Sequence, residues 1–227
     1  MRITGGTARG IPLVLPARGE IRPATDFLRE AVFSSLGAAA VAGTRVLDCF
    51  AGTGAYAWEA LSRGAAAAVL ADKNPAALAA QKRNFAALEK SLVARGAAVP
   101  AVNFLAADLL GARPFPPNFG TEQGGFDLIF CDPPWDLWKK AETAAVIEKI
   151  AALAGTHAGT RLILETPAGF EPRAPAGWFL LKKIGKKGKD QPAANLFARE
   201  NFPENSAENP PENPPENSPE NPSAVPA

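Results

Sequence analysis

Short apolar runs alternate with longer helix-forming stretches between residues 45 and 166. The apolar runs predict strands, and because successive positions are apolar, both faces of the resulting sheet should be buried. Strands and helices that alternate at this spacing indicate an α/β fold with a mostly parallel sheet. The expected strands are Arg45–Cys49, Ala68–Asp72, Ala101–Ala106, Phe126–Cys131 and Arg161–Glu165, and the expected helices are Ala55–Arg63, Pro75–Ala94 and Leu137–Ala154.

The segments on either side of this core depart from the alternation. Arg2–Pro16 contains two strand-like runs around three glycines, which predicts an N-terminal β-hairpin. A helix is expected to begin at Thr25 or Asp26, both of which are suited to cap a helix N-terminus. Further along the chain, Trp178–Ile184 and Ala193–Arg199 are expected to pair in an antiparallel manner.

Residues 203–227 form a four-residue repeat rich in Pro, Glu and Asn. Proline at this density prevents a helix or a central strand, and the segment has too few apolar residues to offset chain entropy. We therefore expect three parts: the hairpin and first helix over residues 1–40, the α/β domain over residues 41–202, and a disordered tail over residues 203–227.

Composition argues against several classes of protein. No apolar run approaches the length of a membrane span, and the N-terminus lacks the apolar segment of a signal peptide, so a cytoplasmic location is expected. Cys49, Cys131 and His157 have no zinc-ligand spacing, so no metal site is expected and the cysteines should be reduced core thiols. The tail contains only acidic charges, which leaves a modestly basic body that is compatible with a polyanionic partner.

A candidate ligand site follows the first expected strand, in the segment Val46–Gly54. A strand, a glycine turn and a helix allow a ligand to approach the backbone and the helix N-terminus. The third glycine of the dinucleotide pattern is absent, and acids stand at three successive strand ends instead. Carboxylates there can bind ribose hydroxyls and a cationic group, which favours S-adenosylmethionine. The expected cofactor-binding residues are Asp48, Phe50, Gly52, Gly54, Asp72, Lys73 and Asp108.

The most specific pattern is the apolar strand that runs into Asp132-Pro133-Pro134-Trp135. Two prolines remove two N–H donors, so carbonyl and carboxylate oxygens dominate this turn and suit a substrate amine. The indole of Trp135 offers a face on which a base can stack. Hydrogen bonds from a base amine to Asp132 and to the Pro133 carbonyl would direct the nitrogen lone pair toward a methyl group. All four residues are therefore expected in the catalytic site.

Four segments resemble the RsmD family of bacterial 16S ribosomal RNA guanine-N2 methyltransferases, over roughly residues 1 to 199. The segments are Arg2-Ile3-Thr4-Gly5-Gly6 with Arg9-Gly10, Arg22–Asp26 with Arg29–Phe33, Val46–Gly54 continuing to Glu59–Gly64, and Asp132–Trp135. The resemblance implies a Rossmann-like class I methyltransferase with a seven-stranded, mostly parallel sheet whose last strand is antiparallel. It also implies S-adenosylmethionine as methyl donor and the N2 amine of one guanine in 16S rRNA as acceptor.

The N-terminal region is rich in arginine and lacks lysine up to the first expected strand. Guanidinium groups bind phosphate in a bidentate manner, which assigns RNA contact to residues 1–40. The expected RNA-binding residues are Arg2, Arg9, Arg22 and Arg29. The expected partner is 16S rRNA or the small ribosomal subunit, and the protein is expected to act as a monomer.

Three alternatives remain open from the residues themselves. The Asp-Pro-Pro-aromatic turn would equally serve the N6 amine of adenine in DNA or RNA. A nicotinamide-dependent oxidoreductase would share the strand-turn-helix unit, although it normally has the third glycine. A catalytically silent RNA-binding module would explain the arginines, but it would give no function to Asp132 or to the glycine turn.

Overall fold

The computed structural model describes residues 1–16, 25–112, 115–116, 119–120, 124–140, 142–153, 156–185 and 191–199. The sequence predictions for Arg22 and for the tail at 203–227 fall outside these residues.

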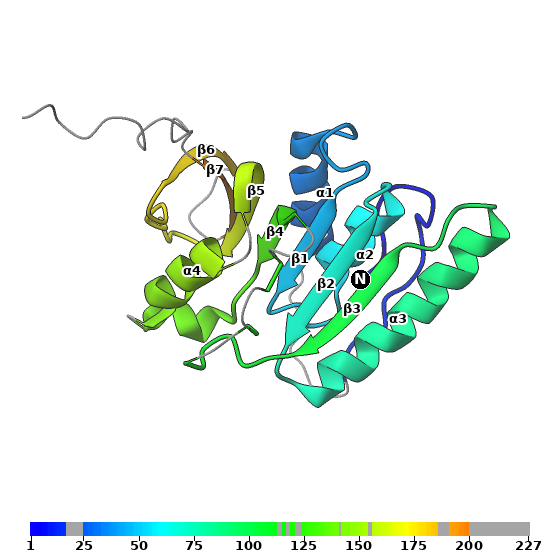
Figure 1. Cartoon of the computed structure of the whole chain (residues 1–227), viewed down its shortest axis with the longest axis horizontal. Coiled ribbons are helices and arrows are strands. Elements are labelled where there is room, and N and C mark those ends of the chain that lie inside the picture. Colours follow the sequence, from blue (N-terminus) through cyan, green and yellow to red (C-terminus); the bar gives the residue numbers. More distant parts are fainter. Residues whose placement is uncertain are drawn as a thin grey trace, which may run out of the picture.

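One seven-stranded sheet runs through the described part of the chain (Figure 1). Its order is β3-β2-β1-β4-β5-β7-β6; the pairs from β3 to β5 are parallel, and β7 is antiparallel to both of its neighbours. This confirms the expected mostly parallel sheet with an antiparallel last strand. The strands are β1 (Arg45–Cys49), β2 (Ala67–Asp72), β3 (Ala101–Ala106), β4 (Phe126–Cys131), β5 (Thr156–Thr166), β6 (Trp178–Ile184) and β7 (Ala193–Arg199).

Helices cover both faces of the sheet. One hydrophobic core, which includes Trp58, joins the first three helices to one face, and a second core, which includes Ile147, joins the remaining two to the other. Val46 belongs to the first core and its neighbour Leu47 to the second, as a strand buried on both faces requires. The helices are α1 (Thr25–Leu36), α2 (Ala55–Ser62), α3 (Pro75–Ala94), the 3-10 helix η2 (Trp135–Lys139) and α4 (Glu142–Leu153).

The helix expected over residues 137–154 is divided into η2 and α4. Lys140 ends η2 in an extended conformation. The amide of Thr143 then donates to the Lys140 carbonyl, and its hydroxyl donates to the Leu137 carbonyl. These bonds begin a new helix, an outcome that depends on local hydrogen bonding rather than on hydrophobic periodicity.

Strand β5 begins at Thr156 rather than at Arg161, where the apolar run starts. Side-chain hydrogen bonds hold its polar first half against β4. The Thr160 hydroxyl donates to the Phe126 carbonyl at 2.8 Å, and the His157 amide donates to the Thr160 hydroxyl at 2.9 Å. The exposed, polar start of the strand explains why an apolar pattern did not reveal it.

The N-terminal segment forms a hairpin with one antiparallel bridge, between Arg2 and Pro12, instead of two full strands. The amide of Ile3 donates to a carbonyl across the hairpin. At its turn, Gly6 has a φ of +76°, and a Cβ there would lie 1.9 Å from the Ser62 carbonyl oxygen. Only glycine therefore allows the hairpin to lie this close to α2.

The hairpin, α1 and the sheet share one core. Ile3 and Leu13 of the hairpin, together with Val32 and Phe33 of α1, belong to the same buried cluster as Val46 of β1. The hairpin and α1 therefore pack on the same face of the sheet as α2 and α3.

Candidate active site

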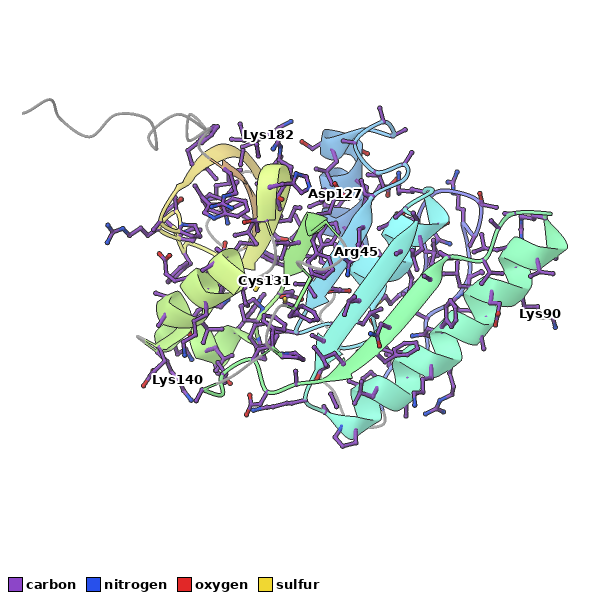
Figure 2. The ribbon with its side chains drawn as sticks, viewed as in Figure 1. Arg45, Lys90, Asp127, Cys131, Lys140 and Lys182 are labelled. Atoms are coloured by element: carbon purple, nitrogen blue, oxygen red, sulfur yellow. The ribbon has the colours of Figure 1, made fainter. Side chains whose placement is uncertain are left out.

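A cavity of about 480 Å³ opens at the carboxyl ends of β1, β2 and β4. This is the usual size and place of a small-molecule site in an open α/β sheet. Figure 2 shows Cys131, which ends β4, at this side of the sheet, and Arg45 and Asp127, near the starts of β1 and β4, at the opposite side. The structure therefore brings several strand ends to a single cavity.

The turn between β1 and α2 forms one wall of the cavity. Phe50 and Gly52 have positive φ angles of 56° and 52°, and both line the cavity. The Gly52 amide donates to Asp72 Oδ2 at 2.8 Å, and Gln81 Nε2 donates to the Gly52 carbonyl at 3.1 Å. For a Cβ added at Gly52, the Phe50 carbonyl oxygen, at 3.9 Å, is the only heavy atom of the described residues within 4 Å. Glycine here leaves the backbone open to a ligand, as its place in the turn predicts.

The structure does not bring Gly54 to the cavity, in contrast to the sequence prediction. Gly54 is the N-cap of α2 with a φ of 80°. A Cβ there would lie 2.5 Å from both Leu70 Cδ2 and Trp58 Nε1. Gly54 is therefore required by packing behind the turn rather than by ligand approach.

Replacing Gly54 with alanine should lower the free energy of unfolding by more than about 2 kcal/mol. The left-handed backbone and the overpacked Cβ each cost on the order of 1–3 kcal/mol. Urea denaturation measures the effect. Gly96→Ala is the matched control, because Gly96 has a φ of +67° and a Cβ added there would meet no heavy atom of the described residues within 4 Å. Equal losses in the two variants would contradict the packing explanation.

Asp72 ends β2 at the cavity wall. Its Oδ2 accepts from the Gly52 amide and its Oδ1 from the Asn74 amide, both at 2.8 Å. A carboxylate has about four acceptor positions, so these bonds orient the group and leave capacity for a ligand. Lys73 and Asp108 also line the cavity and form an ion pair at 3.5 Å, with more than half of each side chain exposed.

Asp48 lies on the cavity wall and is only 2% exposed. Burial raises the pKa of its carboxyl well above the ordinary value; the hydrogen bond from the Ala57 amide opposes this shift, and the nearby Asp132 adds to it. Arg29 supplies an opposing positive charge. A cationic ligand in this cavity would further stabilise the ionised form of Asp48.

The Asp-Pro-Pro-aromatic turn connects β4 to η2. The Asp132 amide donates to the Cys49 carbonyl at 3.4 Å, and the Leu137 amide donates to the Pro134 carbonyl at 2.9 Å. Asp132 and Pro134 line the cavity. Pro133 is buried, and Trp135 is 39% exposed; neither belongs to the cavity wall.

Glu165 and Tyr56 also line the cavity, although the sequence prediction omitted both. Glu165 is 4% exposed near the end of β5, and the Tyr56 hydroxyl donates to its Oε2 at 2.9 Å. The signal that could have found Glu165 is the one that found Asp72, an acid at the end of an apolar strand. Tyr56 lies on a helix and has no comparable signal.

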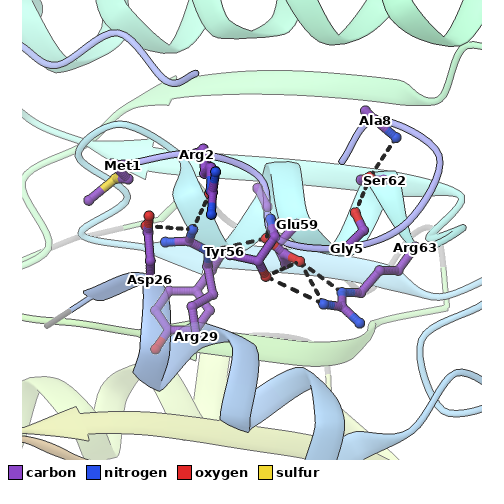
Figure 3. A network of polar contacts seen from close by, with 12 residues as sticks. Met1, Arg2, Gly5, Ala8, Asp26, Arg29, Tyr56, Glu59, Ser62 and Arg63 are labelled. Carbon is purple, nitrogen blue, oxygen red and sulfur yellow. Dashed lines mark hydrogen bonds and ion pairs between the residues drawn. The ribbon is translucent and has the colours of Figure 1, made fainter. Parts of the chain in front are cut away.

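The structure contradicts the prediction that Arg29 contacts RNA. Arg29 is 1% exposed, and its guanidinium pairs with Glu59 at 3.3 Å and with Asp26 at 2.9 Å, and also donates to the Arg2 carbonyl (Figure 3). Arg29 lines the cavity, but its guanidinium is engaged by these partners and is not exposed at the outer surface, where a phosphate backbone would lie. The sequence did not predict that the Arg29 side chain is buried between α1 and α2, because a charged residue is normally expected at the surface.

Glu59 is the centre of this polar network. Its carboxylate is fully buried and accepts hydrogen bonds from Arg29 and Arg63 (Figure 3). It also accepts hydrogen bonds from the amide and the hydroxyl of Thr4. A Cβ at Gly5 would lie 2.2 Å from Arg63 Nη2, so the hairpin glycines make room for the network. The segments around residues 2–6, 29 and 59–63 therefore share a structural role that joins the hairpin to α1 and α2.

Arg2 and Arg9 remain at the surface. Both are exposed and line a second hollow of about 280 Å³ together with Phe27 and Glu30. Their position stays compatible with contact to a phosphate backbone.

The two cysteines are buried free thiols on neighbouring strands, which confirms their expected place in the core. In the described part of the chain, no three His, Cys, Asp or Glu side chains gather as metal ligands. No helix among the same residues is long and apolar enough to cross a membrane.

Comparisons with known proteins agree with this geometry. The family model described as "Conserved hypothetical protein 95" matches residues 1–189. Ribosomal RNA small subunit methyltransferase D of Escherichia coli K12 is 35% identical over 200 residues, which are 88% of this chain and 90% of that protein. The solved structure of Escherichia coli yhhF is 32% identical, covers 88% of this chain and 98% of its own, and has a TM-score of 0.59. A hypothetical protein of Thermus thermophilus is 28% identical, covers 86% of this chain and 98% of its own, and has a TM-score of 0.62.

The strand order, the antiparallel β7 and the cavity beside the β1–α2 turn define a class I methyltransferase fold. The matching family model and the relative from Escherichia coli identify the family within this class. The chain belongs to the RsmD family and is a methyltransferase.

Proposed function

We propose that this protein transfers a methyl group from S-adenosylmethionine to the exocyclic N2 amine of a guanine in small-subunit (16S) ribosomal RNA. The observation that carries the proposal is that one cavity joins Gly52 and Asp72 to Asp132 and Pro134. The name of the relative from Escherichia coli, ribosomal RNA small subunit methyltransferase D, supports the class of substrate. The reaction would occur in the cytoplasm, with the protein as a monomer.

The cavity residues fit this methyl donor. Buried Asp48 lies where a positively charged ligand would stabilise its ionised form. Gly52 leaves space for a ligand against the backbone, and Asp72 presents an oriented carboxylate that can accept hydrogen bonds from ribose hydroxyls. We propose that Phe50, Lys73 and Asp108, which also line the cavity, complete the donor site.

When bound, S-adenosylmethionine supplies a methyl group on a positively charged sulfur, a good leaving group. Asp132 accepts a hydrogen bond from the guanine N2 amine and draws the nitrogen lone pair out of the ring system. The Pro133 carbonyl is the proposed second acceptor, and Pro134 restricts the backbone of the turn. As the N–C bond forms, the bond between the methyl carbon and sulfur would break, and its electron pair would remain on sulfur as a neutral thioether. The nitrogen then loses one proton, which the Asp132 carboxylate accepts and passes to water.

Surface arginines would orient the RNA. Arg2 and Arg9 lie on the hairpin, and the hairpin packs beside the cavity through Met1, which is a cavity-lining residue. Their guanidinium groups can bind phosphate oxygens in a bidentate manner. We propose that the indole of Trp135, which is 39% exposed, stacks on the target base or a neighbouring one.

Replacing Asp72 with alanine should weaken S-adenosylmethionine binding by about 10- to 100-fold. Loss of a hydrogen bond to a charged group costs roughly 1.5–3 kcal/mol, and the Gly52 amide would also lose its partner. Isothermal titration calorimetry measures the affinity. Asp72→Asn, which keeps one acceptor oxygen, should lose less affinity for S-adenosylmethionine. An unchanged affinity in folded Asp72→Ala would contradict the assignment of the donor site.

The function is tested by mapping the modified nucleoside. The protein and labelled donor are incubated with 16S rRNA, and separately with small subunits, from cells that lack this activity. We expect the label in N2-methylguanosine at one position. Label in N6-methyladenosine would contradict the guanine assignment, and transfer to neither substrate would contradict the proposed function.

The relatives do not favour the alternatives. Their names describe methyltransferases, which gives no support to a nicotinamide-dependent oxidoreductase or to a catalytically silent RNA-binding module. The name of the relative from Escherichia coli specifies ribosomal RNA and gives no support to an adenine enzyme that acts on DNA.

A further inference from the structure

Glu165 is a buried carboxylate in the cavity wall that has no part in the proposed methyl transfer. It is 4% exposed and lies near the carboxyl end of β5. In the sheet register, Cys131 of β4 pairs with Leu164 of β5. The next residues along the chain are Asp132, directly beyond β4, and Glu165 on β5. Neighbouring strands lie about 4.8 Å apart. The two carboxylates therefore occupy adjacent positions along one edge of the cavity.

Tyr56 holds the Glu165 carboxylate in place. Its hydroxyl donates to Glu165 Oε2 at 2.9 Å. The Tyr56 ring stacks on Phe130 with ring centroids 4.8 Å apart, and it packs against Phe33 at 6.4 Å. Burial is the largest cause that raises the pKa of Tyr56 well above its usual value, and the charge of nearby Glu165 is the second. The hydroxyl therefore remains a donor at neutral pH. A buried carboxylate with a fixed orientation is suited to recognise one defined edge of a ligand.

Two adjacent acceptors match the hydrogen-bonding edge of guanine. Guanine carries its N2 amine next to the N1–H group, so this edge presents donors side by side. In adenine the amine lies beside an N1 that has a lone pair and no hydrogen. An ionised carboxylate has only acceptors, so it attracts guanine N1–H and repels adenine N1.

We propose that Glu165 accepts a hydrogen bond from N1–H of the target guanine while Asp132 accepts one from N2, and that Glu165 thereby determines the choice of guanine over adenine. This inference rests on the proposed function, because it assumes that the acceptor base enters the cavity with its N2 amine at Asp132. Tyr56 is then a positioning residue, which acts through the carboxylate rather than on the base.

The test compares two bases at the methylated position of an rRNA substrate, guanine and 2-aminopurine. The analogue keeps the amine at C2 but has a lone pair at N1 in place of the N1–H group. A site built to bind an N–H group can reject an analogue without it by several orders of magnitude. For the wild-type protein we expect kcat/KM to favour guanine at least 10-fold.

In Glu165→Ala we expect kcat/KM for guanine to fall and the value for 2-aminopurine to change little, so that the preference decreases at least 10-fold. Glu165→Gln should further raise kcat/KM for 2-aminopurine relative to the value for guanine, because the amide can donate a hydrogen bond to N1. Tyr56→Phe should lower the preference by a smaller factor. Glu171→Gln, which removes an exposed carboxylate paired with Lys183, should leave the preference unchanged.

Binding without the methyl donor gives a second measurement. The affinity of donor-free protein for the two RNAs should show the same decrease in preference in Glu165→Ala. Calorimetry with S-adenosylmethionine alone should show unchanged donor affinity in this variant, which verifies that the cavity is folded.

An unaltered preference for guanine in Glu165→Ala, with donor affinity retained, would overturn the inference and leave the proposed function intact. Failure of the wild-type protein to methylate guanine N2 would instead contradict the proposed function. A preference that falls equally in Glu165→Ala and Glu171→Gln would also overturn the inference, because it would show an effect of net charge alone.

Discussion

Replacing Asp132 with alanine should lower the rate of methyl transfer by on the order of 10²-fold or more, with the fold and donor binding retained. Asp132 lines the cavity directly beyond β4. Its proposed hydrogen bond to the base amine strengthens as the nitrogen acquires positive charge. Removing this bond should therefore destabilise the transition state more than the bound substrate. The main chain at this position would keep its bond to the Cys49 carbonyl, because that bond uses the Asp132 amide.

Single-turnover kinetics with saturating donor measures the effect of Asp132→Ala on the chemical step. Asp132→Asn is the matched variant, because an amide oxygen still accepts a hydrogen bond but cannot hold a proton as a carboxylate does. Partial activity of Asp132→Asn would show that hydrogen bonding is the main role of the residue. Methyl transfer at the wild-type rate by folded Asp132→Ala would mean that the catalytic turn is wrongly assigned.

Replacing Glu59 with alanine should lower the free energy of unfolding by about 3–5 kcal/mol, because it leaves the buried guanidinium of Arg29 without its fully buried ion-pair partner. Arg29 and Glu59 have side-chain exposures of 2% and 0%. The same change removes the acceptors of the Thr4 amide and hydroxyl, which attach the hairpin to α2. The hairpin should therefore loosen together with the loss of global stability.

Urea denaturation measures this loss, and hydrogen exchange at the Thr4 amide measures the loosening of the hairpin. Glu59→Gln should have a smaller effect, because it keeps the size of the side chain and one acceptor oxygen. Glu171→Gln, at the exposed ion pair with Lys183, should change stability by less than about 1 kcal/mol. A loss below about 1 kcal/mol in Glu59→Ala would contradict the central place of this network.

Local patterns predicted most of the elements that support the site. The expected bounds of β1, β3, β4, β6 and β7 and of the long helix α3 coincide with the structure. For α3, Pro75 occupies the first turn and the Asn74 side chain accepts from the Ala76 amide, which are both local signals of a helix start. Prediction was poorer where hydrophobicity is weak, as at the polar start of β5.

The positions of Asp48, Asp72, Asp108 and Asp132 at one cavity also followed from the sequence. Parallel strands place their carboxyl ends at the same edge, so acids at those ends meet whatever the details of packing. The sequence of this protein by itself determined the α/β class, the order of its main elements and this acidic edge. The class and the order follow from local hydrophobic patterns, and the edge follows because any parallel sheet brings the carboxyl ends of its strands together.

Only the tertiary structure decided the roles of Arg29, Gly54 and Glu165. The sequence alone predicts a surface position for Arg29, whereas in the structure its guanidinium is buried and donates to Glu59, 30 positions away. Gly54 reads as a ligand-binding glycine until the side chains of Leu70 and Trp58 are placed against it. Glu165 acquires its orientation from Tyr56, which is 109 positions earlier in the chain. Burial and the identity of distant partners determine these roles, and neither is a property of the local sequence.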